Sequence, residues 1–299
     1  MVRRVARERG VDLFKVKGTG PGGVIVLGDL ERLSSLVGNE KKIDAIEVES
    51  DLDGTVVPLG IIRKAIANHM QESWNCIPHA GTWVWVNFKR FVDQRVALKS
   101  FLVREIGEEQ ARIYVRPDIL VIEGTIRALE DKHRIVNSCF GCEHSPFNQW
   151  RGGLKVFSRI NLGIAYDDPK GLLVPVLHNI AGSSYKIITQ RLEELYQKVR
   201  AVELKVKDFR GGTVTFNNVG ALKGDGGESI IPHGQSAIIS LHRIERDPTS
   251  PLYGLAILAL RFDHRALDGG TAARFLASVK KFVEKTDFKE YIVSQLGFR

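Results

Sequence analysis

The chain has 299 residues, of which 43 % are hydrophobic, and carries a formal net charge of +8. This length suffices for one large domain or two unequal ones with a sizeable buried core. No stretch approaches the roughly 20 apolar residues of a membrane helix, and the basic N-terminus lacks the apolar run of a secretory signal. We therefore expect no membrane association and an intracellular protein, in the cytoplasm or, if eukaryotic, the mitochondrial matrix.

The positive charge favours anionic partners such as phosphorylated cofactors or acidic protein domains. The basic residues are spread along the chain and are not interleaved with aromatic residues in one run. Since that clustering is typical of nucleic-acid-binding surfaces, we expect no binding of nucleic acid.

Residues 1–34 predict a very small helical domain. Two short helices, over 2–9 and from Gly28 or Asp29 to Leu33, flank the loop Gly18-Thr-Gly-Pro-Gly-Gly23. The loop lacks the Lys-Ser or Lys-Thr that completes a phosphate-binding P-loop, so we expect no nucleotide site here. The first helix begins at the initiating methionine without a capping residue, and we expect that residues upstream have been removed.

Residues 35–56 are polar, show no helical periodicity and predict a linker. Residues 57–299 predict one large domain in which helices and strands are mixed. The apolar spacing indicates helices over 60–74, from a cap at Ser183 or Ser184 to Val199, and over 271–285, with strands over 81–86, 156–165, 236–241 and 253–262. The fold class is therefore an α/β layered domain.

Cys139 and Cys142 form a C-x-x-C pair, the spacing of half a zinc site or of a redox motif. A zinc site needs two further ligands, for which only His133 and His144 lie near in the sequence. A redox pair should open a helix after a strand, a context that this segment does not show. We therefore expect reduced thiols that pack, and no bound metal.

His264 is the main candidate for a catalytic residue. It follows the predicted strand 253–262, and Asp268 comes four residues later, before the turn at Gly269 and Gly270. Acyl transfer between thiols needs a base, because a thiol with a pKa of about 8.5 is largely protonated at neutral pH. An imidazole with a pKa of about 6.5 suits that task, although an isolated His-x-x-x-Asp can equally be a turn structure.

The segment Asp263-His-Arg-Ala-Leu-Asp-Gly269 resembles the signature of the dihydrolipoyl acyltransferases, the core subunits of 2-oxo acid dehydrogenase complexes. Further matches are Gly60-Ile-Ile-Arg-Lys-Ala-Ile-Ala-Asn-His-Met70, Ile77-Pro-His79, the segment 162–176 and Gly211-Gly-Thr-Val-Thr-Phe-Asn-Asn-Val-Gly220. The resemblance extends over nearly the whole chain and is weakest over residues 96–115 and 138–155.

The resemblance implies a chloramphenicol acetyltransferase-like mixed sheet with helices, and a homotrimer that assembles into a larger core with the active site between subunits. An acyl group would pass from a lipoyl-lysine, carried on a separate lipoyl domain, to coenzyme A. His264 would take the proton of the coenzyme A thiol. Asp268 would be structural and pair with Arg63, or the two would be an exposed surface pair.

The family supplies a hydrogen bond to the reaction's oxyanion from a serine, and this chain has Asn217 at the matching position. An asparagine amide N–H can donate to an oxyanion, so we expect Asn217 in that role, with a turn residue as its alternative. Thr215, two residues away on the same strand face, is a fallback donor.

The resemblance further implies contacts with coenzyme A from Arg95, Asp167, His242 and Ile244, each of which could instead be a solvated or packing residue. Residues 1–34 resemble the peripheral subunit-binding domain of the family, which docks dihydrolipoyl dehydrogenase or the 2-oxo acid decarboxylase subunit. Its basic face would be formed by Arg3, Arg4 and Arg7.

Two other functions compete with the enzyme. The replacement of the family's serine by Asn217 favours a non-catalytic scaffold that keeps only docking and assembly surfaces. A small-molecule acyltransferase of the same fold is the second alternative, against which the small domain at residues 1–34 argues.

Overall fold

The computed structural model describes residues 57–141, 153–168 and 171–298, together with Val2, Val16, 18–20, 24–26, Gly28 and Asp29. The chain divides into two compact units, Met1–Pro58 and Leu59–Arg299, which are described separately. The predicted docking residues Arg3, Arg4 and Arg7, most of the first predicted helix and the predicted linker lie outside the described residues.

In the first unit, the side chain of Asp29 is hydrogen-bonded to Thr19 and Val26. Its carboxylate accepts hydrogen bonds from the backbone N–H and the hydroxyl of Thr19 and from the backbone N–H of Val26, at 3.0, 2.6 and 2.9 Å. The side chain is only 5 % exposed. Gly28 and Asp29 are helical, as the sequence predicts. One buried carboxylate thus connects Thr19 with Val26.

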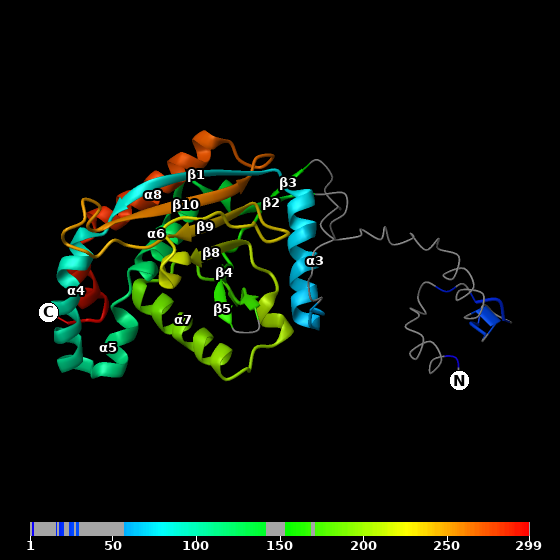
Figure 1. The fold of residues 1–299 in the computed structure, drawn as a ribbon, viewed down its shortest axis with the longest axis horizontal. Helices are drawn as coiled ribbons and strands as arrows, with labels where there is room; N and C mark the ends of the chain where they lie inside the picture. Colours follow the sequence, from blue (N-terminus) through cyan, green and yellow to red (C-terminus); the bar gives the residue numbers. More distant parts are fainter. Residues whose placement is uncertain are drawn as a thin grey trace, which may run out of the picture. The chain divides into compact units, whose positions relative to one another are not determined.

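The second unit is built on a mixed six-stranded sheet (Figure 1). The strand order is β1-β10-β9-β8-β4-β7. The pairs β1/β10, β10/β9 and β4/β7 are antiparallel, whereas β9/β8 and β8/β4 are parallel. The strands are β1 His79–Asn87, β4 Leu162–Ile164, β7 Val176–Leu177, β8 Val214–Asn218, β9 Ala237–Leu241 and β10 Leu255–Asp263. Two small antiparallel ladders pair β2 Ser138–Phe140 with β3 Leu154–Val156, and β5 Tyr166–Asp168 with β6 Gly171–Leu173.

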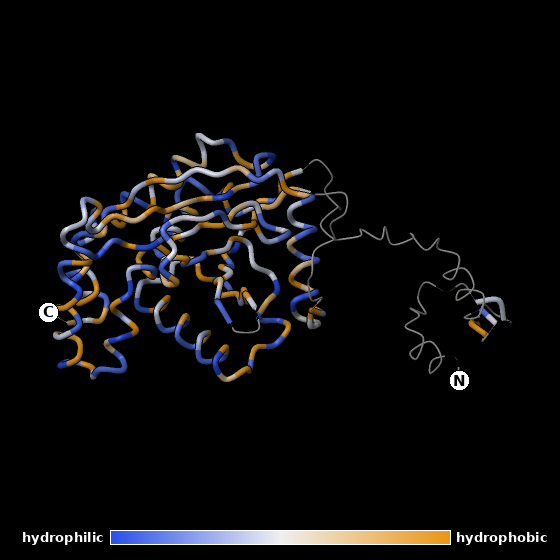
Figure 2. The backbone as a smooth tube through the Cα atoms, viewed as in Figure 1, coloured by the Kyte–Doolittle hydropathy of each residue, from blue (hydrophilic) through white to orange (hydrophobic). Residues whose placement is uncertain are grey.

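One face of the sheet is covered by helices. Helix α8 (Gly269–Lys285) packs on β1 and β10, and α6 (Pro117–Asp131) packs on α8. Helix α7 (Tyr185–Arg200) packs on α6, and α5 (Glu108–Tyr114) and α9 (Phe288–Gln295) pack on α7. Helix α4 (Lys89–Ile106) packs on α5 and α9. Hydrophobic and hydrophilic residues alternate along α4, α5 and α7 (Figure 2), which is typical of helices with one buried side.

Buried and partly exposed side chains alternate along β10. Ala256, Leu258, Leu260 and Phe262 are buried beneath the helices, whereas the residues between them point to the other face. Phe275 and Leu276 of α8 are fully buried in the same core, and burial of each such side chain contributes about 1.5–3 kcal/mol. The strand therefore fixes which side chains remain available on the opposite face.

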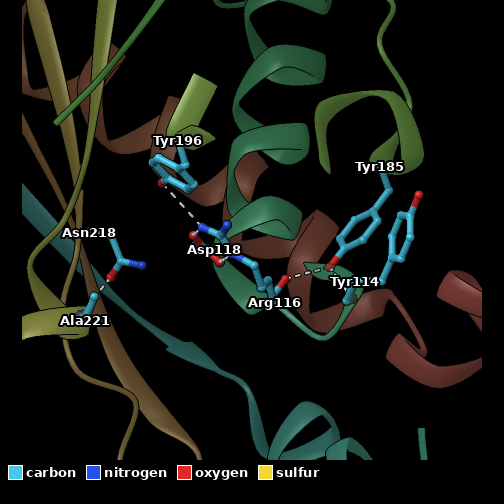
Figure 3. Close-up of polar contacts among 7 residues, drawn as sticks. All are labelled: Tyr114, Arg116, Asp118, Tyr185, Tyr196, Asn218 and Ala221. Atoms are coloured by element: carbon cyan, nitrogen blue, oxygen red, sulfur yellow. Dashed lines mark hydrogen bonds and ion pairs between the residues drawn. The ribbon is translucent and has the colours of Figure 1, made fainter. Parts of the chain in front are cut away.

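A polar cluster joins the start of α6 to α7 (Figure 3). The guanidinium of Arg116 donates to the carboxylate of Asp118 at 2.5 and 3.2 Å and to the hydroxyl of Tyr196 at 3.4 Å. The hydroxyl of Tyr185 lies 2.9 and 2.7 Å from the carbonyl oxygens of Tyr114 and Arg116. These hydrogen bonds connect the start of α6 to α7.

The α/β fold with a mixed sheet and helices is confirmed. Helices α3 (Ile61–Cys76), α7 and α8 and strands β1, β9 and β10 lie where the sequence predicts them. The single strand predicted over 156–165 is wrong, because β3 ends at Val156 and β4 begins at Leu162. Asn137 separates the two strands: its carbonyl accepts from the Phe157 N–H and its side-chain amide donates to the Arg159 carbonyl, at 2.9 and 2.8 Å.

Candidate active site

His264 stands at a rigidly held end of β10. Its backbone N–H donates to the carbonyl of Pro78 at 3.1 Å, directly beyond the last β1/β10 pair, His79 with Asp263. The buried carboxylate of Asp263 accepts from the Arg265 guanidinium at 3.0 and 2.8 Å. The side chain of His264 is exposed, with its ring centroid 5.7 Å from that of Phe262. The imidazole is therefore accessible while its backbone is fixed.

His79 supports the loop beside this strand end. Its Nδ1 lies 2.8 Å from the carbonyl oxygen of Ile77, and its Nε2 lies 3.1 Å from the backbone nitrogen of Ile231. These partners assign the neutral tautomer with the proton on Nδ1. Burial lowers the pKa of His79 below its ordinary value, and the ring stacks on Trp74 at 5.2 Å. The neutral imidazole of His79 thus connects β1 to the segment before β9 by a hydrogen bond.

Asp268 begins α8. Its Oδ1 accepts from the backbone N–H of Thr271 at 2.5 Å, and this hydrogen bond lowers the pKa of the Asp268 carboxyl below its usual range. Among the described residues, Asp268 and Arg63 form no ion pair; the Arg63 guanidinium carbon stands 3.7 Å from where a Cβ on Gly171 would be. The predicted pair is therefore not formed within one chain, because Asp268 is engaged as a helix cap.

Asn217 lies on β8, opposite Ser240 of β9, on the sheet face away from the core helices. Its Nδ2 donates to the hydroxyl of Ser229 at 3.1 Å. The next residue, Asn218, accepts from the backbone N–H of Ala221 at 3.1 Å and so turns the chain (Figure 3). After this turn Gly220 passes so close to His242 that an added Cβ would stand 2.5 Å from the His242 carbonyl. The turn role therefore falls to Asn218, which leaves one N–H of Asn217 available.

Thr215 is fully buried, and its hydroxyl donates to the side-chain oxygen of Gln235 at 2.8 Å. A hydroxyl has one hydrogen to donate. In this arrangement that hydrogen is engaged by Gln235, and a donor role of Thr215 stays a prediction.

His264 and Asn217 are not brought together within one chain. Asn217 pairs with Ser240, which pairs with Ala259 of β10. His264 lies five residues beyond Ala259 along the chain, a distance of about 17 Å at about 3.4 Å per residue of strand. Within one chain, the two side chains therefore do not reach the same substrate atom.

Arg95 of α4 and Arg246, in the segment after β9, carry like charges that influence each other. The Nε of Arg95 is buried and, in the described part of the chain, has no hydrogen-bond partner. Partial burial, and secondarily the charge of Arg95, lower the pKa of Arg246. Two guanidinium groups that repel each other form a favourable position for an anion.

The remaining predicted cofactor contacts differ in exposure. Asp167 is exposed on β5. His242 is only 2 % exposed, with Nδ1 and Nε2 lying 3.2 and 3.3 Å from the carbonyl oxygens of Ile257 and Gly227. Ile244 is buried in the main core. Both side chains are thus buried within one chain, and their contact with coenzyme A stays a prediction.

A cavity of about 1020 Å³ opens between α3 and the sheet. Its lining is mostly apolar and includes Ile66 and Met70 of α3, Leu173 of β6, Phe209 and Pro232. Gln235, the partner of Thr215, also lines it, which places the cavity on the same sheet face as Asn217.

Burial raises the pKa of the Cys139 thiol to about 11, and the side chain is 1 % exposed, as expected of a packing thiol. Cys142 lies outside the described residues. No group of three or more His, Cys, Asp or Glu side chains in the described segments could hold a metal ion. Among the same residues, no helix has the length and apolar character that crossing a bilayer requires.

Comparison with known proteins decides the family. The model of the 2-oxoacid dehydrogenases acyltransferase catalytic domain matches residues 52–290. The chain belongs to this acyltransferase family. A second model, that of the E3 binding domain, matches residues 1–31. Together they confirm the resemblance seen in the sequence motifs.

Individual relatives of the acyltransferase family agree. The chain is 29 % identical to the lipoamide acyltransferase component of the branched-chain alpha-keto acid dehydrogenase complex of Bacillus subtilis, over 96 % of this chain and 71 % of that protein. It is 27 % identical to the mitochondrial dihydrolipoyllysine-residue acetyltransferase component of the pyruvate dehydrogenase complex of Schizosaccharomyces pombe, over 95 % of this chain but only 59 % of that longer protein. A crystal structure of a probable dihydrolipoamide acetyltransferase from Listeria monocytogenes matches with a TM-score of 0.66 and 32 % identity, over 78 % of this chain and 95 % of that one.

Sequence reasoning missed two candidate residues of this acyltransferase, Ser229 and Arg246. Ser229 lies 12 residues after Asn217, and Arg246 is far from Arg95 in the chain. Only the pairing of β8 with β9 and the packing of the segment after β9 bring each beside its neighbour. No local motif marks either position.

Proposed function

We propose that this chain transfers an acyl group between a lipoyl-lysine, or free dihydrolipoamide, and coenzyme A, as the core subunit of a 2-oxo acid dehydrogenase complex. The observation that carries the proposal is the accessible His264 at the fixed end of β10, within the motif Asp263-His-Arg-Ala-Leu-Asp-Gly269 of an acyltransferase-family chain.

His264 is the general base. It removes the proton from the coenzyme A thiol, and the thiolate attacks the carbonyl carbon of the acyl-lipoyl thioester to give a tetrahedral oxyanion. When the intermediate collapses, the bond from carbon to the lipoyl sulfur breaks and the imidazolium returns its proton to that sulfur. The backbone is held on both sides of His264. Before it, Arg265 forms an ion pair with Asp263, and after it, Asp268 caps α8.

The oxyanion is held by the unengaged Nδ2–H of Asn217 from a neighbouring chain. This assignment follows from the separation of about 17 Å between the two residues along the sheet, whereas an oxyanion donor must lie about 3 Å from the reacting oxygen. A homotrimer with one site at each seam between chains meets this requirement, and trimers would build the larger core.

Coenzyme A phosphates bind at Arg95 and Arg246. The buried, unpartnered Nε of Arg95 and the mutual repulsion of the two guanidinium groups both favour an arriving anion. Asp167, exposed on β5, is a polar contact for the rest of the cofactor. The apolar cavity beside α3 suits the hydrocarbon part of the lipoyl arm or its acyl group.

Residues 1–34 form a docking domain for dihydrolipoyl dehydrogenase or the decarboxylase subunit, with Arg3, Arg4 and Arg7 as its basic face. The match of residues 1–31 to the E3 binding domain supports this role. The predicted domains are then 1–34, a linker over 35–56 and the catalytic domain 57–299, and a separate domain carries the lipoyl group. The expected location is the cytoplasm or a mitochondrial matrix, since relatives of both bacterial and mitochondrial origin match.

A non-catalytic scaffold is the second candidate, favoured by Asn217 in the serine position. Turnover of free dihydrolipoamide with acetyl-, succinyl- and branched-chain acyl-CoA by the assembled protein decides between the two. We expect transfer with at least one donor. An assembled particle that binds dihydrolipoyl dehydrogenase but shows no turnover with any of them would establish the scaffold.

A further inference from the structure

Asn217 is the first member of a hydrogen-bonded network of three side chains. Its Nδ2 donates to Ser229 Oγ at 3.1 Å, and Ser229 Oγ lies 2.9 Å from Ser240 Oγ. Ser240 is 2 % exposed, whereas Ser229 is half-buried. The network therefore extends from the buried sheet to a hydroxyl at its surface.

The segment that carries Ser229 is tied to the sheet on both sides. Asp225 pairs with Arg243, and Glu228 pairs with Arg261 of β10 at 2.7 Å. Two residues after Ser229, the backbone N–H of Ile231 donates to His79 at 3.1 Å. These contacts fix the position of the Ser229 hydroxyl before any substrate binds, as an oxyanion donor requires.

The lone pairs and the hydrogen of Ser229 Oγ determine whether this hydroxyl can donate to a substrate. Ser229 Oγ has two lone pairs and one hydrogen. Asn217 fills one lone pair, and in the orientation in which Ser240 is the donor of the serine pair, the Ser240 hydroxyl fills the other. The hydrogen of Ser229 is then free to donate elsewhere, and an arriving negative charge favours this orientation over the one in which Ser229 donates to Ser240.

We propose that Ser229 is a second oxyanion donor, which acts beside the side-chain amide of Asn217 and restores the hydroxyl that the family's serine would have provided. The two N–H bonds of an amide diverge by about 120°, so Asn217 and Ser229 donate to one oxygen together when the Asn217 amide turns away from Ser229. Nδ2 and Oγ, which are 3.1 Å apart, can then both lie about 2.7–3.1 Å from that oxygen. The inference rests on the proposed acyl transfer and deepens it. No bond is made or broken by Ser229, which only stabilises the negative oxygen.

The test compares two side chains of equal shape. Ser229→Thr keeps the hydroxyl and Ser229→Val lacks it, so their difference reports on the hydroxyl and not on packing. We expect Ser229→Val to lower kcat about 10²–10³-fold relative to Ser229→Thr, with the KM for coenzyme A unchanged. Ser294→Ala, on the exposed side of α9, is the matched control and should keep wild-type turnover.

Equal kcat values for the Thr and Val variants, in a wild type whose turnover depends on His264, would overturn the role of Ser229 and leave the proposed function intact. A parallel loss of kcat in both variants would likewise overturn it, since it would report on shape. No turnover by the assembled wild type would overturn the proposed function and the inference together. Thermal unfolding and assembly state, measured on each variant, ensure that folded particles are compared.

Discussion

Subunit complementation tests whether the site lies between chains. Within one chain, the sheet register separates Asn217 and His264 by about 17 Å, several times the reach of a hydrogen bond. If each site takes His264 from one chain and Asn217 from the next, a mixture of two inactive variants must contain intact sites. His264→Ala and Asn217→Ala are those variants.

The expected recovery follows from the mixing ratio. In randomly assembled equal mixtures, a seam is intact when its first chain keeps His264 and its second chain keeps Asn217. Each condition holds with a probability of about one half, so about one quarter of the seams are intact in a closed heterologous ring. Each pure variant should show at most about 1 % of wild-type kcat, because loss of the base or of an oxyanion donor costs about 10²–10⁴-fold.

The assay is coenzyme A acylation by the two variants after co-expression or joint refolding, compared with the same variants assembled separately and then mixed. We expect about 25 % of wild-type turnover in the co-assembled sample and none above background in the other. Recovery that stays at background, in particles shown by mass spectrometry to contain both chains, would refute the intersubunit site.

Two further predictions concern the anion site and His79. Arg246→Ala should raise the KM for coenzyme A about 10–100-fold with little change in kcat, since a charge-assisted hydrogen bond contributes about 1.5–3 kcal/mol. The control Arg200→Ala, on the exposed side of α7, should have no effect. An unchanged KM in Arg246→Ala would remove Arg246 from the site. Because the folded pKa of His79 is lowered from 6.5, its contribution to stability is present above about pH 6.5 and is lost as the pH falls toward the folded pKa. Urea unfolding at about pH 7.5 and pH 5.5 should show a larger loss in the wild type than in His79→Gln, and equal losses would contradict the assigned neutral state.

Elements with strong local patterns could be predicted from the sequence. The apolar runs of β9 and β10 and the stripe of α8 mark these elements because one face of each is buried against the core. Helix α6 was missed, since residues 119–122 read as a short apolar run and its polar Glu123 is buried too. One oxygen of Glu123, Oε1, accepts from Arg127 and from Tyr291 of α9, at 2.8 and 2.6 Å, partners that no local pattern indicates.

The site was predictable in its residue types and not in its spatial arrangement. The motif around His264 identifies the base, but the sequence gives no sheet order, and so the distance from Asn217 was hidden. Asp268 was expected to pair with Arg63, yet its position before Gly269 makes it the cap of α8, a role that its spacing to Thr271 could have indicated. Ser229 and Arg246 depend on contacts between distant segments.

The measurement that tests the central claim most directly is the acyl-transfer kcat of His264→Ala beside that of His178→Ala, an exposed histidine after β7. With dihydrolipoamide and the best acyl-CoA donor, we predict that His264→Ala lowers kcat about 10²–10⁴-fold while His178→Ala retains the wild-type value. A His264→Ala particle that assembles normally and turns over at the wild-type rate would contradict the account.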